Sequence, residues 1–145
     1  MIAEMCLILL LATANDLICE PDVPSIYEMP FLVTVYDTAL CEDGESCLQG
    51  NGDGYFASMV PVSDDWYGIM AACDPALFGL WVNVSGLGTV YCGDSFGYFN
   101  GEPVETIIQM DDGQWVTRMD VFYPVAANGY PSWNYNLFYD WSVQW

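Results

Sequence analysis

Three aspartates in segments of β-strand character are the best candidates in this chain for acid–base chemistry. Asp74 precedes Pro75 at the end of an apolar run, Asp94 closes the run TVYCGD, and Asp120 interrupts the apolar run MDVFY. Burial and a neighbouring carboxylate each raise the pKa of a carboxyl group, which lets it exchange protons nearer neutral pH. The three positions therefore indicate carboxylate catalysis if the fold brings them together.

Composition leaves carboxylates as the main acid–base groups. The chain of 145 residues has 20 Asp and Glu, one arginine (Arg118), no lysine and no histidine, with a formal net charge of −19. Without histidine there is no Ser-His-Asp or Cys-His nucleophile, and without lysine there is no Schiff base or phosphate-loop lysine. One arginine cannot form a basic patch, which excludes nucleic acids and anionic membrane surfaces as partners. We expect no cofactor.

The elements that position these residues have the pattern of an all-β domain. At this length one domain is expected, and 54% hydrophobic with 16% aromatic residues is enough to build a core. After residue 30, short β-favouring runs alternate with turn signals, and one short helical turn is expected around Pro75–Phe78. The runs are FLVTVYDTAL, GYFASMVPV, WYGIMAA, LWVNVSG, TVYCGD, ETIIQM, QWVTRMDVFYPV and NLFYDWSVQW.

The segment 71–97 predicts how two of the aspartates meet. It has a strand ending at Asp74, a turn at Gly79, a strand, a Gly-rich turn and a second strand that delivers Asp94. We expect its two halves to be antiparallel, which places Asp74 and Asp94 near the same end. A disulfide between Cys73 and Cys92 would hold these two strand ends together.

The six cysteines indicate disulfides and an oxidising compartment. None has the CxxC spacing of a zinc or redox site, and a Cys41–Cys47 bridge would close the acidic segment CEDGESC. Reduced, buried cysteines that pack as small apolar residues are the alternative. The acidic loops at 41–45 and 51–54 lack the bidentate Glu of a calcium loop, so we expect solvated turns and no metal site.

The N-terminal segment 1–30 is predicted to be a degenerate export signal followed by a linker. Residues 5–14 form a ten-residue apolar run with the length of a signal-peptide core, but Glu4 stands where a positive residue is usual. A core helix or strand is the alternative. The Pro-rich segment 20–30 is the expected linker, and 31–145 is the expected domain, located outside the cell or in the cell envelope.

The order of motifs along 31–123 resembles the 3D domain family, named for three aspartates. The matching elements are Thr34-Val35-Tyr36, the turn Gly52-Asp53-Gly54, the block Ala72-Cys73-Asp74-Pro75, the turn Gly86-Leu87-Gly88, Asp94-Ser95-Phe96-Gly97 and Met119-Asp120-Val121-Phe122. The family's Gly-Gly-Ala-Ile-Lys-Gly run is absent after Asp94, and an insertion (GEPVETIIQMDDGQW) separates Asp94 from Asp120.

That resemblance implies a six-stranded double-psi β-barrel, related to membrane-bound lytic transglycosylase A, with a C-terminal aromatic-rich extension. It implies cleavage of peptidoglycan or another polysaccharide, with Asp94 or Asp120 as general acid/base and Asp74 as a supporting carboxylate. Tyr36 and Gly97 would bind substrate. The alternative is a purely structural role, in which Asp74 caps a turn and Asp120 accepts backbone hydrogen bonds.

Two further questions stay open at the level of sequence. Trp133 and Tyr135 belong to an aromatic-rich C-terminal stretch, which is either a glycan-binding platform or a terminal hairpin packed on the barrel. The whole domain is either a glycan-cleaving enzyme or a non-catalytic extracellular module that binds glycan or protein. The geometry of the three aspartates discriminates between these functions. The sequence does not specify an oligomeric state.

Overall fold

A computed structural model describes residues 23–37 and 54–144. No helix within these ranges is long and apolar enough to cross a membrane. The elements in chain order are η1 (Ile26–Glu28), β1 (Phe31–Tyr36), η3 (Asp64–Trp66), β2 (Met70–Ala72), η4 (Pro75–Leu77), β3 (Trp81–Val84), β4 (Gly88–Asp94), β5 (Tyr98–Phe99), β6 (Glu102–Pro103), β7 (Ile107–Gln109), β8 (Trp115–Phe122), α2 (Val125–Asn128), β9 (Asn136–Phe138) and β10 (Trp141–Gln144), where η marks a 3-10 helix.

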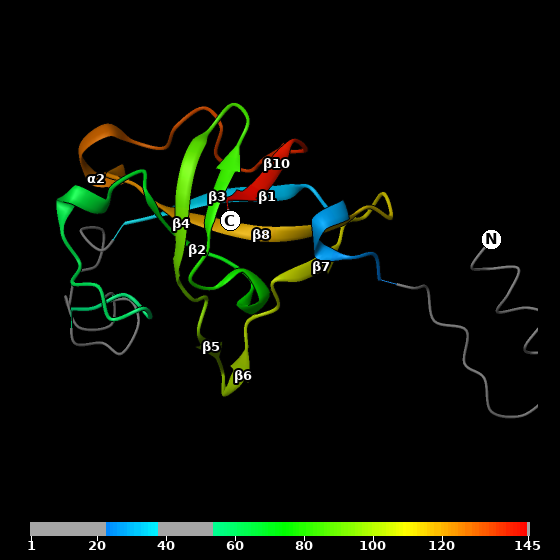
Figure 1. Ribbon diagram of the computed structural model, residues 1–145, viewed down its shortest axis with the longest axis horizontal. Helices are drawn as coiled ribbons and strands as arrows, with labels where there is room; N and C mark the ends of the chain where they lie inside the picture. Colours follow the sequence, from blue (N-terminus) through cyan, green and yellow to red (C-terminus); the bar gives the residue numbers. More distant parts are fainter. Residues whose placement is uncertain (1–22, 38–53, 145) are drawn as a thin grey trace, which may run out of the picture.

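Eight strands form one curled sheet, and β5 and β6 form a separate hairpin that projects from it (Figure 1). The sheet order is β10-β3-β4-β2-β8-β1-β9. The long strand β8 is its centre. One edge of β8 pairs in parallel with β1, while its other edge is shared by β7 near its start and β2 near its end. The two aspartate-bearing strands β4 and β8 therefore flank the short strand β2.

The connection between β9 and β10 explains the curl. β9 pairs with β1 and β10 pairs with β3, so they lie at opposite ends of the sheet. Only Tyr139 and Asp140 lie between them in the chain. Two residues span at most about 11 Å between flanking Cα atoms. The sheet must therefore bend until its two ends are nearly in contact.

The sheet buries a different cluster on each face. One face carries the larger core, which includes Phe31, Val33, Val82, Met119 and Val121. The alternate positions of the same strands supply the opposite face, where Met70 and Phe122 pack with Phe56 from the segment 54–69. This second face also carries the even-numbered residues of β1, β2 and β8, and it is the face of the candidate site.

Residues 23–30 and the C-terminal strands cover the larger core. Met29 is buried and its carbonyl accepts a hydrogen bond from the indole N–H of Trp141 at 2.8 Å. The ring of Trp141 lies 4.3 Å from that of Phe31, centroid to centroid. The aromatic C-terminal stretch thus supplies two strands of the sheet instead of extending from it, but these strands do not form a hairpin with each other. Phe138 and Trp141 pack on the larger core as the packing alternative predicted, whereas Tyr130, Tyr135 and Tyr139 are exposed. Residues 1–22, with the expected export signal, lie outside the described residues.

The coarse fold prediction is confirmed, and its details are corrected in three places. The domain is almost entirely β, and η4 falls where the helical turn was expected. A six-stranded double-psi barrel is not confirmed, because the sheet has eight strands and is open. The run 54–62 forms only an isolated Tyr55–Pro61 bridge, because its backbone turns at Met59, where φ is 68°. β2 and β4 are parallel neighbours in the sheet, and β3, which lies between them in the chain, is the strand antiparallel to β4.

Cys73 and Cys92 form the predicted disulfide. It joins the residue after β2 to the interior of β4, so it fixes the two strands whose ends carry Asp74 and Asp94. No free cysteine is present among the described residues. A structural disulfide is typical of proteins in an oxidising environment. Cys41 and Cys47 lie outside the described residues, so their pairing stays a prediction.

Replacing both Cys73 and Cys92 by Ala is expected to lower the free energy of unfolding by about 3 kcal/mol, because the bridge closes a loop of roughly 20 residues in the unfolded chain. Urea unfolding followed by tryptophan fluorescence measures the effect. An unchanged midpoint in the double variant would contradict a stabilising role for this bridge.

Candidate functional site

The pairing register places two of the three aspartates in one row across the sheet. Ala72 of β2 pairs with Asp94 of β4 on one side and with Asp120 of β8 on the other. Asp120 pairs in turn with Thr34 of β1. Residues paired side by side in a sheet point to the same face. The row Thr34, Asp120, Ala72, Asp94 therefore presents two carboxylates to one surface, separated by the small side chain of Ala72.

A one-residue bulge is what brings Asp94 into that row. Met70 pairs with Tyr91, but Ala72 pairs with Asp94, so β4 contributes one more residue than β2 between the two pairs. With regular pairing Ala72 would lie opposite Gly93, and Asp94 would point to the aliphatic core. An added Cβ at Gly93 would overlap the ring of Tyr91 and lie 2.8 Å from Sδ of Met70. A side chain at this position would therefore have to displace the Tyr91 ring and the end of Met70.

Asp94 is fully buried and held by three donors. The Tyr36 hydroxyl donates to its Oδ2 at 2.8 Å, and the N–H of Ala57 donates to its Oδ1 at 2.9 Å. Ser95 adds a backbone hydrogen bond. Burial raises the pKa of Asp94, while these donors oppose the rise by stabilising the charged form. Burial and the adjacent carboxylate raise the pKa of Tyr36 well above its usual value, so Tyr36 stays a proton donor.

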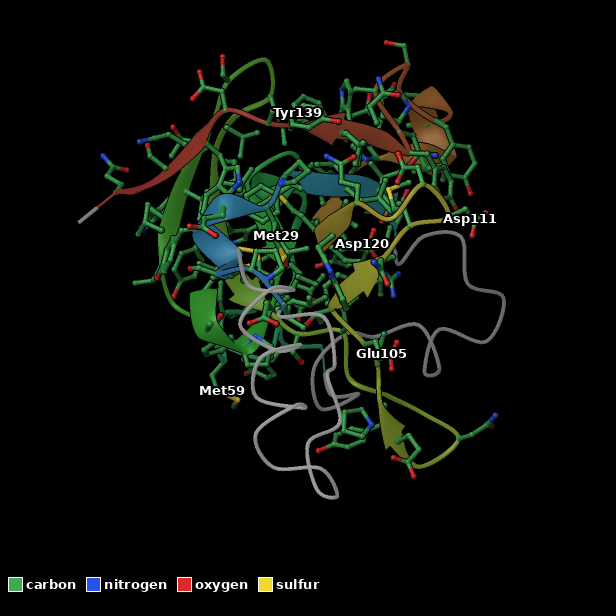
Figure 2. All side chains as sticks on the ribbon, turned by 90° about the vertical axis from the view of Figure 1, so that its right-hand side faces the viewer. Met29, Met59, Glu105, Asp111, Asp120 and Tyr139 are labelled. Atoms are coloured by element: carbon green, nitrogen blue, oxygen red, sulfur yellow. A yellow bond between two sulfur atoms is a disulfide. The ribbon has the colours of Figure 1, made fainter. Side chains whose placement is uncertain are left out.

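Asp120 is only partly buried and is the more accessible carboxylate of the pair. The Thr34 hydroxyl donates to its Oδ1 at 2.8 Å. Burial raises its pKa to about 6; the Thr34 hydrogen bond and the Arg118 charge oppose this rise, and the charge of Asp94 adds to it. A carboxyl group with such a pKa can both give and accept a proton near pH 6. Figure 2 shows Asp120 on the side of the molecule that also carries Glu105.

Asp94 and Asp120 lie on opposite sides of Ala72 in this row. Two strand spacings separate the Cα atoms of Asp94 and Asp120, which corresponds to about 10 Å. Paired catalytic carboxylates in glycosidases stand about 5 to 9.5 Å apart, measured between carboxyl groups. The arrangement can therefore supply one proton-exchanging carboxyl and one fixed negative charge to the same small region.

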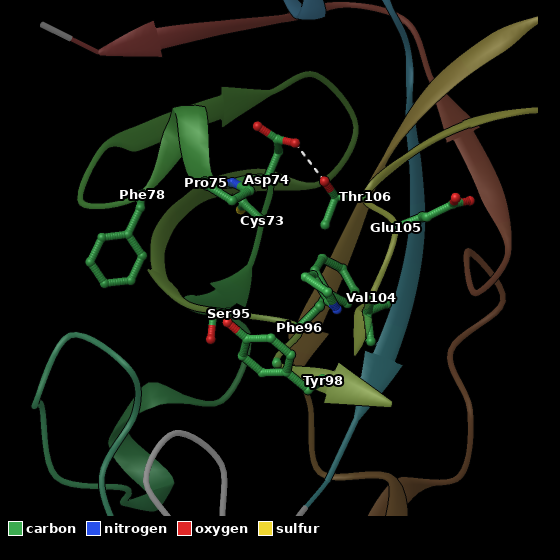
Figure 3. Close-up of a pocket in the computed structure, with 12 residues that line it drawn as sticks. Cys73, Asp74, Pro75, Phe78, Ser95, Phe96, Tyr98, Val104, Glu105 and Thr106 are labelled. Atoms are coloured by element: carbon green, nitrogen blue, oxygen red, sulfur yellow. Dashed lines mark hydrogen bonds between the residues drawn. The ribbon is translucent and has the colours of Figure 1, made fainter. Parts of the chain in front are cut away.

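Asp74 lies two residues beyond Ala72 and lines a pocket of about 690 Å³ beside the row. Its Oδ1 accepts the N–H of Ala76 at 2.8 Å, which caps η4, and its Oδ2 accepts the Thr106 hydroxyl (Figure 3). The capping role expected of the Asp-Pro step is therefore present. Asp74 also lines the pocket, together with Ser95 and Phe96 that directly follow Asp94.

The remaining predicted binding residues divide into two groups. Tyr36 contacts Asp94, and Gly97 lines the pocket beside Asp74, with a φ of 70° that favours glycine. Trp133 instead packs edge to face on Tyr123 with 5.5 Å between ring centroids, and Tyr135 has 72% of its surface exposed. Neither Trp133 nor Tyr135 lines the pocket.

Sequence reasoning missed several residues that build the site. Thr34 orients Asp120, and its position two residues before Tyr36 in a strand places both on one face. That spacing was a usable signal. Gly93 and Thr106 had no such signal, because one acts through a bulge and the other belongs to the insertion. Arg118 lies 4.8 Å above the Phe96 ring, measured from its guanidinium carbon to the ring centroid.

Within 23–37 and 54–144, no group of three His, Cys, Asp or Glu side chains is arranged to hold a metal ion. Comparisons of the chain with protein-family models, curated proteins and solved structures found no match. The geometry of the two carboxylates and of the pocket is therefore the basis for proposing a function.

Gly93→Ala is expected to destabilise the protein by roughly 1–3 kcal/mol, because the added methyl overpacks against Tyr91 and Met70. Urea unfolding measures the loss. A Tyr91→Ala and Gly93→Ala double variant is the control: removing the ring should make its loss smaller than the sum of the two single losses. Additive losses would contradict the proposed clash.

The pKa of Asp120 predicts a pH-dependent stability. Its pKa is about 6 in the folded protein and about 3.9 in an unfolded chain, so the folded state holds the extra proton between these values. The free energy of unfolding should therefore fall as pH rises from about 4 to about 6, by on the order of 3 kcal/mol from this group.

Urea unfolding at pH 4.5 and 7.5 tests this expectation. Asp120→Asn should lose that part of the pH dependence, while Asp111→Asn, which neutralises an exposed carboxylate in the β7–β8 turn, should keep it. Equal pH dependence in the parent and Asp120→Asn would show that Asp120 ionises normally.

Proposed function

We propose that this chain is a glycan-cleaving enzyme of the lytic transglycosylase type that acts on peptidoglycan, with Asp120 as general acid/base. The observation that carries the proposal is the pairing of Ala72 with the buried Asp94 on one side and with the partly exposed Asp120 on the other. Burial raises the pKa of Asp120 to about 6. Asp94 has no exposed surface, so of the pair only Asp120 can touch a substrate.

In the proposed reaction Asp120 begins protonated. It gives its proton to the glycosidic oxygen as the bond from that oxygen to C1 of the sugar breaks. The oxygen of the sugar's own 6-hydroxyl then forms a bond to C1, and Asp120 takes the proton that this hydroxyl loses. The product is a 1,6-anhydro sugar, no water is consumed, and Asp120 returns to its starting state.

Asp94 acts in this scheme as a positioning residue with a fixed charge. Its hydrogen bonds from Tyr36 and Ala57 favour the ionised form and hold the side chain in place. Its negative charge raises the pKa of Asp120. The same charge would stabilise the positive charge that develops on the sugar ring as the glycosidic bond breaks.

The finer fold and the location are part of the proposal. The curled sheet would be an enlarged relative of the double-psi barrel of the 3D domain family, in which the insertion after Asp94 supplies β6 and β7. The order of the aspartates and the Thr34–Asp120 contact support this relationship. The Cys73–Cys92 disulfide supports an extracellular or cell-envelope location.

A second candidate function is a non-catalytic extracellular module that binds glycan or protein. The full burial of Asp94, with three hydrogen-bond donors around it, favours this candidate because such a network also serves to hold loops together. The segment that donates from Ala57 covers Asp94. In that case Asp120 would stabilise β1 through Thr34 and would perform no chemistry.

Purified peptidoglycan discriminates between the two functions. The parent should release soluble fragments with 1,6-anhydro ends, detected by mass spectrometry, and activity should fall as pH rises above about 6 because Asp120 loses its proton. Asp120→Asn should reduce release by about a hundredfold or more. Asp94→Asn should shift the alkaline limb of the pH profile to lower pH, because a neighbouring negative charge is removed.

The matched control is Asp65→Asn, which neutralises an exposed carboxylate in η3 and should release fragments at the parent rate. Fragment release by Asp120→Asn at the parent rate would refute the catalytic assignment. A parent protein that binds peptidoglycan and releases nothing would favour the binding module.

A further inference from the structure

The pocket beside Asp74 has the chemistry of a binding site that the proposed reaction does not use. Its volume of about 690 Å³ lies in the range of small-molecule sites. One wall comes from the segment of η4, which supplies Asp74 and Phe78, and the other comes from residues 95–98 and 103–106. Half of the second wall, residues 103–106, belongs to the insertion between Asp94 and Asp120.

Aromatic rings give the pocket faces on which a flat, partly apolar ligand can stack. Phe78 and Tyr98 are 43% and 75% exposed, respectively. Figure 3 shows Tyr98 across the pocket from Asp74, and Phe78 on the same η4 segment as Asp74. Sugar rings present C–H faces that pack on such aromatic surfaces, and cations are attracted to the ring faces.

Asp74 is held in place but keeps capacity for a ligand. Ala76 and Thr106 each donate to one of its oxygens, so the side chain is fixed on both sides. A carboxylate has about four acceptor sites, and these two donors leave about two of them. Glu105 also lines the pocket, but its carboxylate points away from Asp74 (Figure 3). Asp74 is therefore the anchoring charge.

The charge of the chain selects the class of ligand. The net charge of −19 repels anions, and the single basic residue Arg118 lies over Phe96 with its guanidinium donating to the Glu105 carbonyl. A neutral sugar would use the rings and leave the Asp74 carboxylate without a charged partner. A ligand with one positive charge on a sugar ring uses both features.

We propose that this pocket binds an amino sugar with a free ammonium group, such as an N-deacetylated glucosamine unit of a glycan chain. The ammonium donates to Asp74, and the sugar ring packs on Tyr98 and Phe78. The inference rests on the proposed function in taking a glycan as the ligand. It adds a preference for N-deacetylated chains. The pocket lies close to the proposed reaction site, because Ser95 and Phe96, which line it, directly follow Asp94 in the chain.

Binding of two matched oligosaccharides tests the proposal. Glucosamine tetrasaccharide and its fully N-acetylated counterpart differ only in the amino groups, and isothermal titration calorimetry gives both affinities. The parent should bind the free-amine form at least about tenfold more tightly, and added NaCl should reduce that preference. Equal affinities for the two oligosaccharides would overturn the proposal.

Variants assign the preference to the pocket. Asp74→Asn keeps a helix-capping side chain and should lose about tenfold in affinity for the free-amine form only. Asp111→Asn removes one exposed carboxylate and should keep the preference, so equal losses in the two variants would indicate bulk charge and overturn the site. Tyr98→Ala should weaken both oligosaccharides severalfold, while Tyr130→Ala, which removes another exposed ring, should weaken neither.

Separate measurements distinguish failure of this inference from failure of the proposed function. Asp65→Asn, which neutralises an exposed carboxylate outside the pocket and the proposed reaction site, should bind the free-amine tetrasaccharide as the parent does. If the parent cleaves peptidoglycan but shows no free-amine preference, the proposed amino-sugar site is refuted and the proposed enzymatic function stands. If the parent shows a free-amine preference that depends on Asp74 but does not cleave peptidoglycan, the proposed amino-sugar site stands and the proposed enzymatic function is refuted.

Discussion

The candidate site depends on a one-residue shift in the pairing of β2 with β4. Because of that shift Asp94 points to the face that carries Asp120, whereas regular pairing would direct it to the aliphatic core. Gly93 accommodates the shift, because a side chain there would meet the Tyr91 ring. The Cys73–Cys92 bridge joins the same two strands, so the disulfide and the bulge together fix the position of Asp94 relative to Ala72.

The two faces of the sheet differ in what they bury. One face packs Phe31, Val33 and Met119 against the C-terminal strands, and this burial supplies most of the apolar stabilisation. The other face pairs a small cluster around Phe122 with Asp94 and Asp120, whose burial opposes their ionisation. Such carboxylates reduce stability at neutral pH, so they persist only where a larger core elsewhere offsets them.

Local sequence signals predicted the strands well and their spatial partners poorly. The alternating runs at β1, β3 and β8 and the helical turn at Pro75 were visible because their periodicity is local. The parallel pairing of β2 with β4, the bulge at Gly93 and the burial of Asp94 depend on contacts between distant segments, which no local pattern contains. The proximity of Asp94 and Asp120 was expected from the resemblance to a known family, and the pairing register supplies its physical cause.

Arg118 links the two parts of the site and limits both. Its charge lowers the pKa of Asp120, while Asp94 and burial raise it, so the value of about 6 is a balance of these effects. The same guanidinium covers one face of Phe96, which lines the pocket beside Asp74. A second cation there would compete with a cationic ligand and would lower the pKa of Asp120 further. The scarcity of basic residues is therefore compatible with both a proton-donating Asp120 and a cation-binding pocket, and each would be weakened by adding one.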